Sequence, residues 1–309
     1  MAPLFLTVAL VGVVSACGNG DGDAEVDATV PTPVAPQVSE SVEPQIVQLD
    51  AVVHFAGFEI TVEEAALEPA EQGLFGGSPT VTVTGAAENL GTSAAQIRPF
   101  IYLDVGGRVS PLQAGRSELG QIAAGSRADI ELVFEVVEDF ELADGVLRFG
   151  GDGIVAATVP LDGDAEPVPL DPVDLALTGT AEAGDLVLSV TSGEARFDRT
   201  DLHEQAEDGK AFVIVSFGVT FNGEAGGPSY PFGEDETRLR TPDGAELAPI
   251  EFPIELLRPG TTTNDLTLIF EIDNDEPGGY ALVVVHVPGL PTETMAELPF
   301  EVPALASGA

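Results

Sequence analysis

Residues 128–137, ADIELVFEVV, decide the fold, because their apolar and acidic side chains alternate with a period of two. The apolar members, which would share one face of an extended chain, are Ile130, Leu132, Phe134 and Val136, and the acidic members opposite them are Glu131 and Glu135. This spacing is typical of a half-buried β-strand and does not fit the 3.6-residue period of a helix. The stretch therefore predicts a strand with one face in a core.

A second copy of this stretch lies further along the chain. The segment LTLIFEI, residues 266–272, aligns without a gap with IELVFEV of the first stretch. Each copy follows an Asn at a turn by a similar distance, which is 45 residues from Asn89 to Phe134 and 48 residues from Asn222 to Phe270. The two halves are therefore predicted to be an internal duplication of one strand-rich unit.

The composition supports a fold of many short strands. The chain has 309 residues and 44% hydrophobic content, enough for two ordinary cores, with 35 Gly, 24 Pro and no Trp. We expect an all-β protein with two immunoglobulin-like β-sandwich domains in tandem, each of about seven strands. The expected domains are residues 51–160 and 174–303, joined by an acidic, proline-containing linker at 161–173 and followed by a tail at 304–309.

The charge is strongly acidic along the whole chain. Eleven Lys and Arg stand against 52 Asp and Glu, which gives a formal net charge of −41. Binding of nucleic acid through phosphate neutralisation is excluded, because no basic patch is present. Acidity spread in this way favours a role in solubility and self-repulsion, and the alternative is binding of divalent cations or basic partners.

The N-terminal segment has the features of an export signal. Residues 3–16, PLFLTVALVGVVSA, are apolar and uncharged, but they are shorter than the roughly 20 residues that span a bilayer. They fit the apolar region of a signal peptide covering residues 1–16. The preceding Met-Ala lacks the usual Lys or Arg, which leaves open a start further upstream. The only cysteine, Cys17, follows at once, and the alternative is a buried free thiol at a hydrophobic terminus.

Residues 17–50 are predicted to be a disordered tether, because their Gly, Asp, Pro, Ser and Thr show no helical or two-residue apolar period. As a flexible coil, residues 18–50 would span roughly 30 Å. No cysteine remains after Cys17, so the two domains would be held by their apolar cores without disulfides.

The four residues VSAC, Val14 to Cys17, resemble the lipobox of bacterial lipoproteins. The segments VTVTGAAENLG, FIYLDVGGRVSPL and GQIAAGSRADIELVFEV in residues 51–160 resemble the immunoglobulin-like domains of uncharacterised members of that class, and residues 174–303 do so more loosely. The resemblance implies a diacylglyceryl group on the Cys17 thiol and cleavage just before it. It also implies an extracytoplasmic location on the bacterial cell membrane, with the lipid membrane and an unknown envelope or extracellular molecule as partners. It brings no catalytic residues.

Motifs for catalysis are weak. The three histidines, His54, His203 and His286, do not have the spacing of metal ligands on a helix. GDGIVA, residues 151–156, matches a loose dinucleotide fingerprint but precedes a β-branched strand rather than a helix, so it is predicted to be a glycine-rich hairpin turn. Residues 199–210, RTDLHEQAEDGK, are expected to form a short helical turn or mobile loop with Asp201 as its cap.

Calcium is the most plausible cofactor that the sequence suggests, and otherwise none is expected. Hard cations take clustered carboxylate oxygens. The weak metal candidates, which fall on two loops, are Glu234, Asp235, Glu236, Asp273, Asp275 and Glu276. Neither loop fits the twelve-residue EF-hand pattern, and solvated acidic turns are the favoured explanation of both, because this chain has acidic residues in most of its loops.

The function expected from the sequence is that of a non-enzymatic, lipid-anchored cell-surface protein with a binding or spacer role. The alternative is a carboxylate-based hydrolase, or a calcium-dependent binding protein, that uses the acidic loops. A hydrolase would need two convergent carboxylates in a concave pocket.

Overall fold

The alternating segments form strands, and the protein is all-β. The structure is a computed structural model that describes residues 44–70, 77–97 and 100–305. The predicted strand around Phe134 is β6 (Arg127–Glu135), with Ile130, Leu132, Phe134 and Val136 all buried. The predicted signal peptide, Cys17 and the tether up to residue 43 lie outside the described residues, as do residues 306–309 of the tail.

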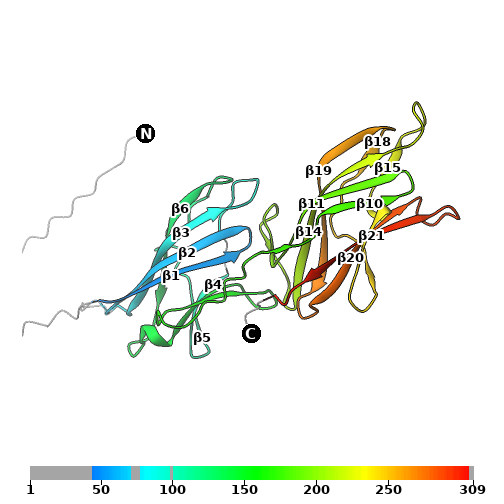
Figure 1. Ribbon diagram of the computed structural model, residues 1–309. Coiled ribbons are helices and arrows are strands. Elements are labelled where there is room, and N and C mark those ends of the chain that lie inside the picture. Colours follow the sequence, from blue (N-terminus) through cyan, green and yellow to red (C-terminus); the bar gives the residue numbers. More distant parts are fainter. Residues whose placement is uncertain (1–43, 71–76, 98–99, 306–309) are drawn as a thin grey trace, which may run out of the picture. The chain divides into compact units, whose positions relative to one another are not determined.

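The first half of the described chain contains two antiparallel sheets (Figure 1). The first sheet contains, in spatial order, β1 (Gln45–Phe55), β2 (Phe58–Glu68), β3 (Thr80–Asn89) and β6. The second sheet contains, in spatial order, β5 (Arg108–Pro111), β4 (Ile101–Val105), β7 (Gly145–Phe149) and β8 (Ala157–Pro160). A short 3₁₀ helix, η1 (Leu142–Asp144), precedes β7.

The second half repeats this arrangement. One sheet contains, in spatial order, β10 (Gly179–Ala183), β11 (Leu186–Arg196), β14 (Lys210–Phe221) and β19 (Thr261–Asp273), with β9 (Val173–Leu175) pairing to β11. The other contains β17 (Glu246–Leu247), β16 (Thr237–Arg240), β20 (Gly278–His286) and β21 (Thr294–Val302). The smaller elements are the pair β12 (Asp198–Arg199) and β13 (Glu204–Gln205), the pair β15 (Tyr230–Phe232) and β18 (Glu255–Leu257), and η2 (Glu234–Glu236).

The strand orders of the two halves are equivalent, element for element. β1-β2-β3-β6 corresponds to β10-β11-β14-β19, and β5-β4-β7-β8 corresponds to β17-β16-β20-β21. In immunoglobulin nomenclature, β2, β3 and β6 take the positions of strands A, B and E, and the second sheet takes those of C′, C, F and G. β1 is an additional edge strand, so the first half has eight strands rather than about seven. The repeated order supports the duplication that the sequence predicts.

The predicted boundary between tether and first domain is wrong by several residues. β1 starts at Gln45, within the segment expected to be disordered. Val47, Leu49 and Ala51 lie on the same, more buried face of β1 as Phe55, and exposed residues alternate with them. The pairing of β1 with β2 shifts register between Gln48 and Ala51, which interrupts the ladder of paired residues but not the alternation of buried side chains.

The predicted linker, residues 161–173, also needs correction. Leu161 and Leu170 are buried, and Val168 forms an isolated bridge with Thr158 of β8. These apolar side chains attach the segment to the first half despite its proline and acidic content. The predicted hairpin turn at residues 151–156 is confirmed, because β7 and β8 pair antiparallel on either side of it.

Phenylalanine fills both cores. The largest fully buried side chains include Phe55, Phe58, Phe134 and Phe149 in the first half and Phe197, Phe217, Phe232 and Phe270 in the second. Pairs from adjacent elements contact one another, with ring centroids 6.3 Å apart for Phe55 and Phe149. At this separation aromatic pairs add to the free energy gained from area burial.

A glycine in the first sheet provides a test of this packing. β2 shifts register between Val62 and Glu64 opposite Gly85 of β3, where a Cβ would overlap the carbonyl oxygen of Thr61. We expect Gly85→Ala to lower the free energy of unfolding by about 1–3 kcal/mol, the usual cost of overpacking. Gly115→Ala is the control, since open space surrounds that glycine, and it is expected to change stability by less than about 0.5 kcal/mol. Equal urea midpoints for the two variants would contradict the close contact at Gly85.

Candidate functional site

The hairpin formed by β12 and β13 contacts the turn between β1 and β2. The helical turn predicted here from the sequence is wrong, because Asp198 and Arg199 pair with Gln205 and Glu204 as strands, and a loop connects them. His203, with φ of +54°, makes the tight connection between the two strands. The hairpin thus joins the two halves of the described chain.

A buried chain of hydrogen bonds runs through this joint. The Gly57 N–H donates to Oδ2 of Asp198 at 2.6 Å, and the Arg196 Nε–H donates to Oδ1 of the same carboxylate at 2.7 Å. Arg196 and Asp198 are both buried. Burial alone would lower the pKa of Arg196, but the charges of Asp198 and Glu194 and their hydrogen bonds raise this pKa above its ordinary value. The guanidinium of Arg196 therefore stays charged inside the joint.

Two further side chains of the hairpin contact Ala56. The Ala56 N–H donates to Oε1 of Gln205 at 2.9 Å, and Nδ1 of His203 lies 3.3 Å from the Ala56 carbonyl oxygen. A carbonyl only accepts, so Nδ1 carries the proton in this pair. The imidazole also packs on Phe58, with ring centroids 5.2 Å apart. Both backbone polar groups of Ala56 are thereby paired.

Glycines permit this close approach. Gly57 has φ of +79°, and a Cβ there would lie 2.8 Å from Nδ1 of His203. At Gly91 a Cβ would lie 2.6 Å from Cε1 of the same ring. Any side chain at either position would push the hairpin away from the turn.

One other connection supports the joint. The Val155 N–H donates to the Ala206 carbonyl at 3.0 Å, and the Asp208 N–H donates to the Gly153 carbonyl at 3.0 Å, so the β7–β8 turn pairs with the segment after β13. The joint is therefore made at two places along the chain. Within the first half, the His54 N–H donates to the Pro169 carbonyl at 2.7 Å and so holds the segment 161–173 against β1.

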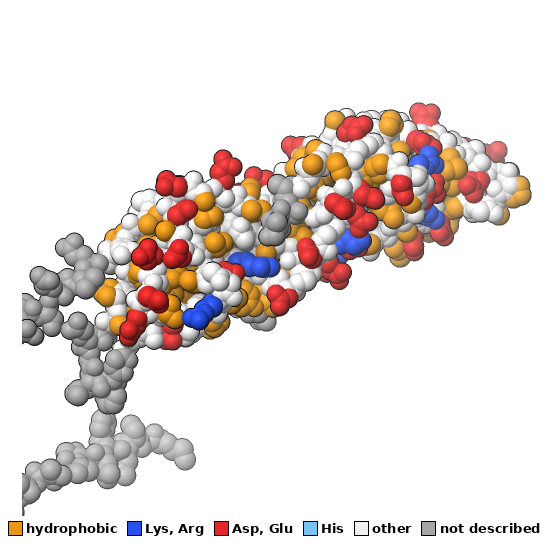
Figure 2. All heavy atoms as spheres, turned by 90° about the horizontal axis from the view of Figure 1, so that it is seen from below, with side chains coloured by type: hydrophobic (Ala, Val, Ile, Leu, Met, Phe, Trp, Pro, Cys, Tyr) orange, Lys and Arg blue, Asp and Glu red, His pale blue; other side chains and the backbone are white. Residues whose placement is uncertain are grey.

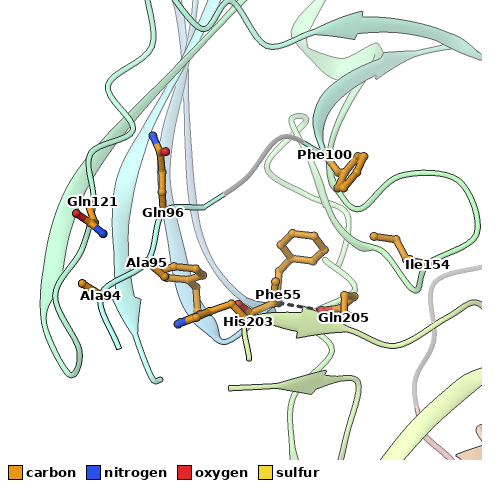
Figure 3. Close-up of a pocket in the computed structure, with 11 residues that line it drawn as sticks. Phe55, Ala94, Ala95, Gln96, Phe100, Gln121, Ile154, His203 and Gln205 are labelled. Carbon is orange, nitrogen blue, oxygen red and sulfur yellow. Dashed lines mark hydrogen bonds between the residues drawn. The ribbon is translucent and has the colours of Figure 1, made fainter. Parts of the chain in front are cut away.

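A cavity of about 690 Å³ lies beside the joint (Figure 3). The described residues that line it come from both halves, and they are Phe55, Ala56, Phe58, Ala94, Ala95, Gln96, Phe100, Gln121, Ile154, His203 and Gln205. Figure 3 shows Phe55, Phe100 and Ile154 on one side, Gln96 and Gln121 on the other, and Gln205 hydrogen-bonded at the base. None of these lining residues is acidic, and none is Lys or Arg.

The first predicted acidic cluster is a structural turn. The carboxylate of Glu236 is buried and accepts hydrogen bonds from the Gly233 N–H at 2.7 Å and the Tyr230 hydroxyl at 3.1 Å. Asp235 and Glu234 are exposed, and Arg238 contacts the Asp235 carboxylate at 3.4 Å and the Glu234 carbonyl at 2.7 Å. The cluster does not converge on a common point.

The second predicted cluster follows β19. Asp273 accepts a hydrogen bond from Nζ of Lys210 at 2.6 Å, and the Glu276 carbonyl accepts one from the Tyr280 hydroxyl at 2.9 Å. Asp275 is exposed. Across the described ranges, no three His, Cys, Asp or Glu side chains lie together as a group able to hold a metal ion. The structure does not bring the six calcium candidates together.

The three histidines take structural positions. His54 contacts Asp171 at 3.1 Å and Glu59 at 3.7 Å, near the start of the second half. His286 packs against Tyr230, with ring centroids 5.1 Å apart. Of the three, His203 lines the cavity.

Sequence analysis missed the joint residues. Asp198 and Gln205 bond to Gly57 and Ala56 across more than 140 positions, and no local pattern signals such a contact. The available sign was two arginines, Arg196 and Arg199, close together in a chain with only eleven basic residues. Arg199 contacts Glu204 and Glu251 and so fixes the hairpin to its own half.

Comparisons of this chain with protein-family models and with curated proteins found no match.

The joint predicts unequal effects of two neighbouring substitutions. Asp198→Ala would leave Arg196 charged and buried with one partner lost, and it is expected to lower the free energy of unfolding by about 3–5 kcal/mol. Asp201→Ala removes a half-exposed carboxylate 3.8 Å from Arg199 and is expected to cost at most about 1 kcal/mol. Urea unfolding measures both. In addition, the Gly57 amide should exchange with solvent faster in Asp198→Ala only, and unchanged exchange would contradict its bond to Asp198.

The tyrosines predict a loss of stability at alkaline pH. Burial raises the pKa of Tyr280 to about 12, with the nearby carboxylates of Glu276 and Asp273 adding to the shift. The phenol stays protonated in the folded state while the unfolded chain ionises near pH 10, so stability falls as pH rises from about 10 to 12. Tyr280→Phe should show a shallower fall across this window in urea titrations. A slope identical to that of the unmodified protein would contradict the shift.

Proposed function

We propose that this chain is a lipid-anchored cell-surface protein, without enzymatic activity, that holds two joined sandwiches away from a bacterial membrane and presents them to a partner. The observation that carries the spacer role is the joint, where a buried ion pair and backbone hydrogen bonds connect the two halves. A spacer needs such a connection, because two domains on a free linker would reorient independently. We also propose that residues 45–160 and 173–302 are two repeats of one domain.

The proposed anchor is the thiol of Cys17. The segment before it is apolar and ends in small residues, and Gly and Asp follow it closely. Two acyl chains at about 0.8 kcal/mol per buried methylene would hold the protein at a membrane. A search of the described residues found no helix that is both long and apolar enough to cross a membrane. The resemblance to bacterial lipoproteins supports the same location.

The acidic surface supports a general role for charge. Figure 2 shows Asp and Glu side chains scattered over the visible face, with Lys and Arg sparse among them. A scattered field favours solubility and keeps copies of the chain apart on a crowded surface. It does not mark one place for a basic partner.

No specific observation favours the hydrolase alternative. Its requirement is a pair of convergent carboxylates in a cavity, with one pKa raised. The two carboxyl groups with a shifted pKa, Asp162 and Asp243, both lie in exposed turns where hydrogen bonds lower the pKa. For Asp162 these come from the Ala165 and Asp164 N–H groups, and for Asp243 from the Thr241 hydroxyl and the Ala245 N–H.

Lipidation can be tested by mass spectrometry of the protein extracted from native membranes. Cleavage before Asp21 would release the short peptide of residues 17–20, which we expect to carry a diacylglyceryl group on Cys17. The Cys17→Ser variant should move from the membrane fraction to the soluble fraction or retain residues 1–16. An unmodified Cys17 peptide from the membrane fraction would refute the anchor.

A further inference from the structure

The cavity beside the joint has three features that together specify a ligand. It is built by both halves of the described chain, its described lining carries no Asp, Glu, Lys or Arg, and buried nitrogen atoms on its lining side chains have no partner. Its volume of about 690 Å³ falls within the usual range of small-molecule sites.

The lining residues disfavour a charged ligand. The chain carries a net charge of −41, so an anion entering the cavity would be repelled by the protein as a whole. A cation would find no carboxylate among the described lining residues to replace its hydration. The described lining instead offers carboxamides and aromatic rings, which suit an uncharged ligand with hydroxyl groups.

Among the described side chains that line the cavity, two have a buried nitrogen without a hydrogen-bond partner. They are Nε2 of Gln205 and Nε2 of His203. Because Oε1 of Gln205 already accepts from the Ala56 N–H, its NH₂ group is free to donate. Because Nδ1 of His203 faces a carbonyl oxygen, its Nε2 is an acceptor. A buried polar group left unpaired costs about 1–3 kcal/mol, so these atoms favour a ligand or water that brings hydroxyl groups.

Aromatic rings form part of the lining. Phe100 is 44% exposed and lines the cavity together with the buried rings of Phe55 and Phe58, and Figure 3 shows Phe55 and Phe100 on the same side. Gln96 donates its Nε2 to the Leu119 carbonyl, which leaves its Oε1 as an acceptor, and Gln121 lines the same space. The cavity therefore offers one flat apolar surface together with donors and acceptors.

We propose that this cavity binds a neutral saccharide, with the C–H face of one ring on Phe100 and its hydroxyl groups on Gln96, Gln121 and Gln205. A pyranose combines an apolar face with uncharged hydroxyls that both donate and accept, which matches each group described above. An apolar aromatic ligand would use the phenylalanines but leave the carboxamides unpaired. The proposal rests on the binding role proposed above and names its ligand class.

The test uses the full-length protein in a zwitterionic detergent whose headgroup contains no sugar. Saturation-transfer NMR would be recorded with three neutral probes, which are maltotriose, cellotriose and the N-acetylglucosamine trimer. The glucosamine trimer and the galacturonate trimer are the cationic and anionic counterparts, and indole is the apolar probe. We expect at least one neutral trisaccharide to bind, and the charged trimers and indole to bind at least tenfold more weakly.

Three variants locate the binding. Phe100→Ala removes the stacking surface, and Ala94→Trp fills the cavity from an exposed position, so each should weaken binding at least tenfold. Val137→Ala changes a side chain of similar exposure, 47%, that does not line the cavity, and it should leave binding unchanged. A thermal melt of each variant checks that the fold is retained.

The outcomes separate this proposal from the proposed function. Binding that is lost in Phe100→Ala and Ala94→Trp but kept in Val137→Ala supports the saccharide site. No binding of the three neutral probes, equal binding of the charged trimers, preference for indole, or binding unaffected by Ala94→Trp would each overturn it. Acylation of Cys17 is measured independently, so an anchored protein that binds no sugar would refute the ligand and leave the anchor standing.

Discussion

The carboxylate of Asp198 is the interaction on which the joint between the two halves depends. One oxygen accepts from the backbone of Gly57 and the other from Arg196, so a single buried group links a turn of the first sandwich to a strand of the second. A buried ion pair of this kind contributes less to stability than its geometry suggests, because desolvation offsets much of the attraction. The ion pair contributes to specificity, since a shift of the hairpin along the turn would leave a buried charge without a partner. Gly57 and Gly91 also define the position of the hairpin, because a side chain at either residue would overlap the ring of His203.

The elements that could be predicted from the sequence are those with a local period. β6 and β19 alternate over seven or more residues, so the alternation assigns the face of each strand that enters the core, although Val133 and Ile269 on the opposite faces are buried as well. The start of β1 was missed although Val47, Leu49 and Ala51 carry its alternation, because these residues lie within an acidic, proline-containing region whose composition is typical of a tether. The attachment of the linker to the first half could not be predicted for a related reason. Composition and lack of periodicity place the boundary at residues 161–173, whereas burial of Leu161 and Leu170 depends on neighbours that are distant in sequence.

The candidate site could not be predicted from the sequence at all. Its residues are Phe, Ala, Gln and Ile, which are ordinary in any domain, and the one histidine among them has no motif around it. The acidic loops are the metal candidates in the sequence, because clustered carboxylates can be recognised without a structure. In the structure Glu236 instead closes a turn and Asp273 pairs with the only lysine. The acidic residues of these loops thus have local structural roles. The joint instead consists of residues such as Asp198 and Gln205, whose partners are more than 140 positions away in the sequence.

The hairpin of the joint lies in a connection between two strands that have equivalents in the other half. The two halves share one strand order, yet the connections between their equivalent strands differ. Between β11 and β14 the second half carries the β12–β13 hairpin, and the equivalent connection in the first half, between β2 and β3, is residues 69–79, of which residues 71–76 lie outside the described ranges. Loops of a sandwich tolerate change because the core does not depend on them. A single loop of the second half therefore supplies the contacts with Ala56 and Gly57, while both halves keep the same strand order. The same loop helps to form the cavity, since His203 and Gln205 belong to the hairpin and the remaining described lining residues belong to the first half.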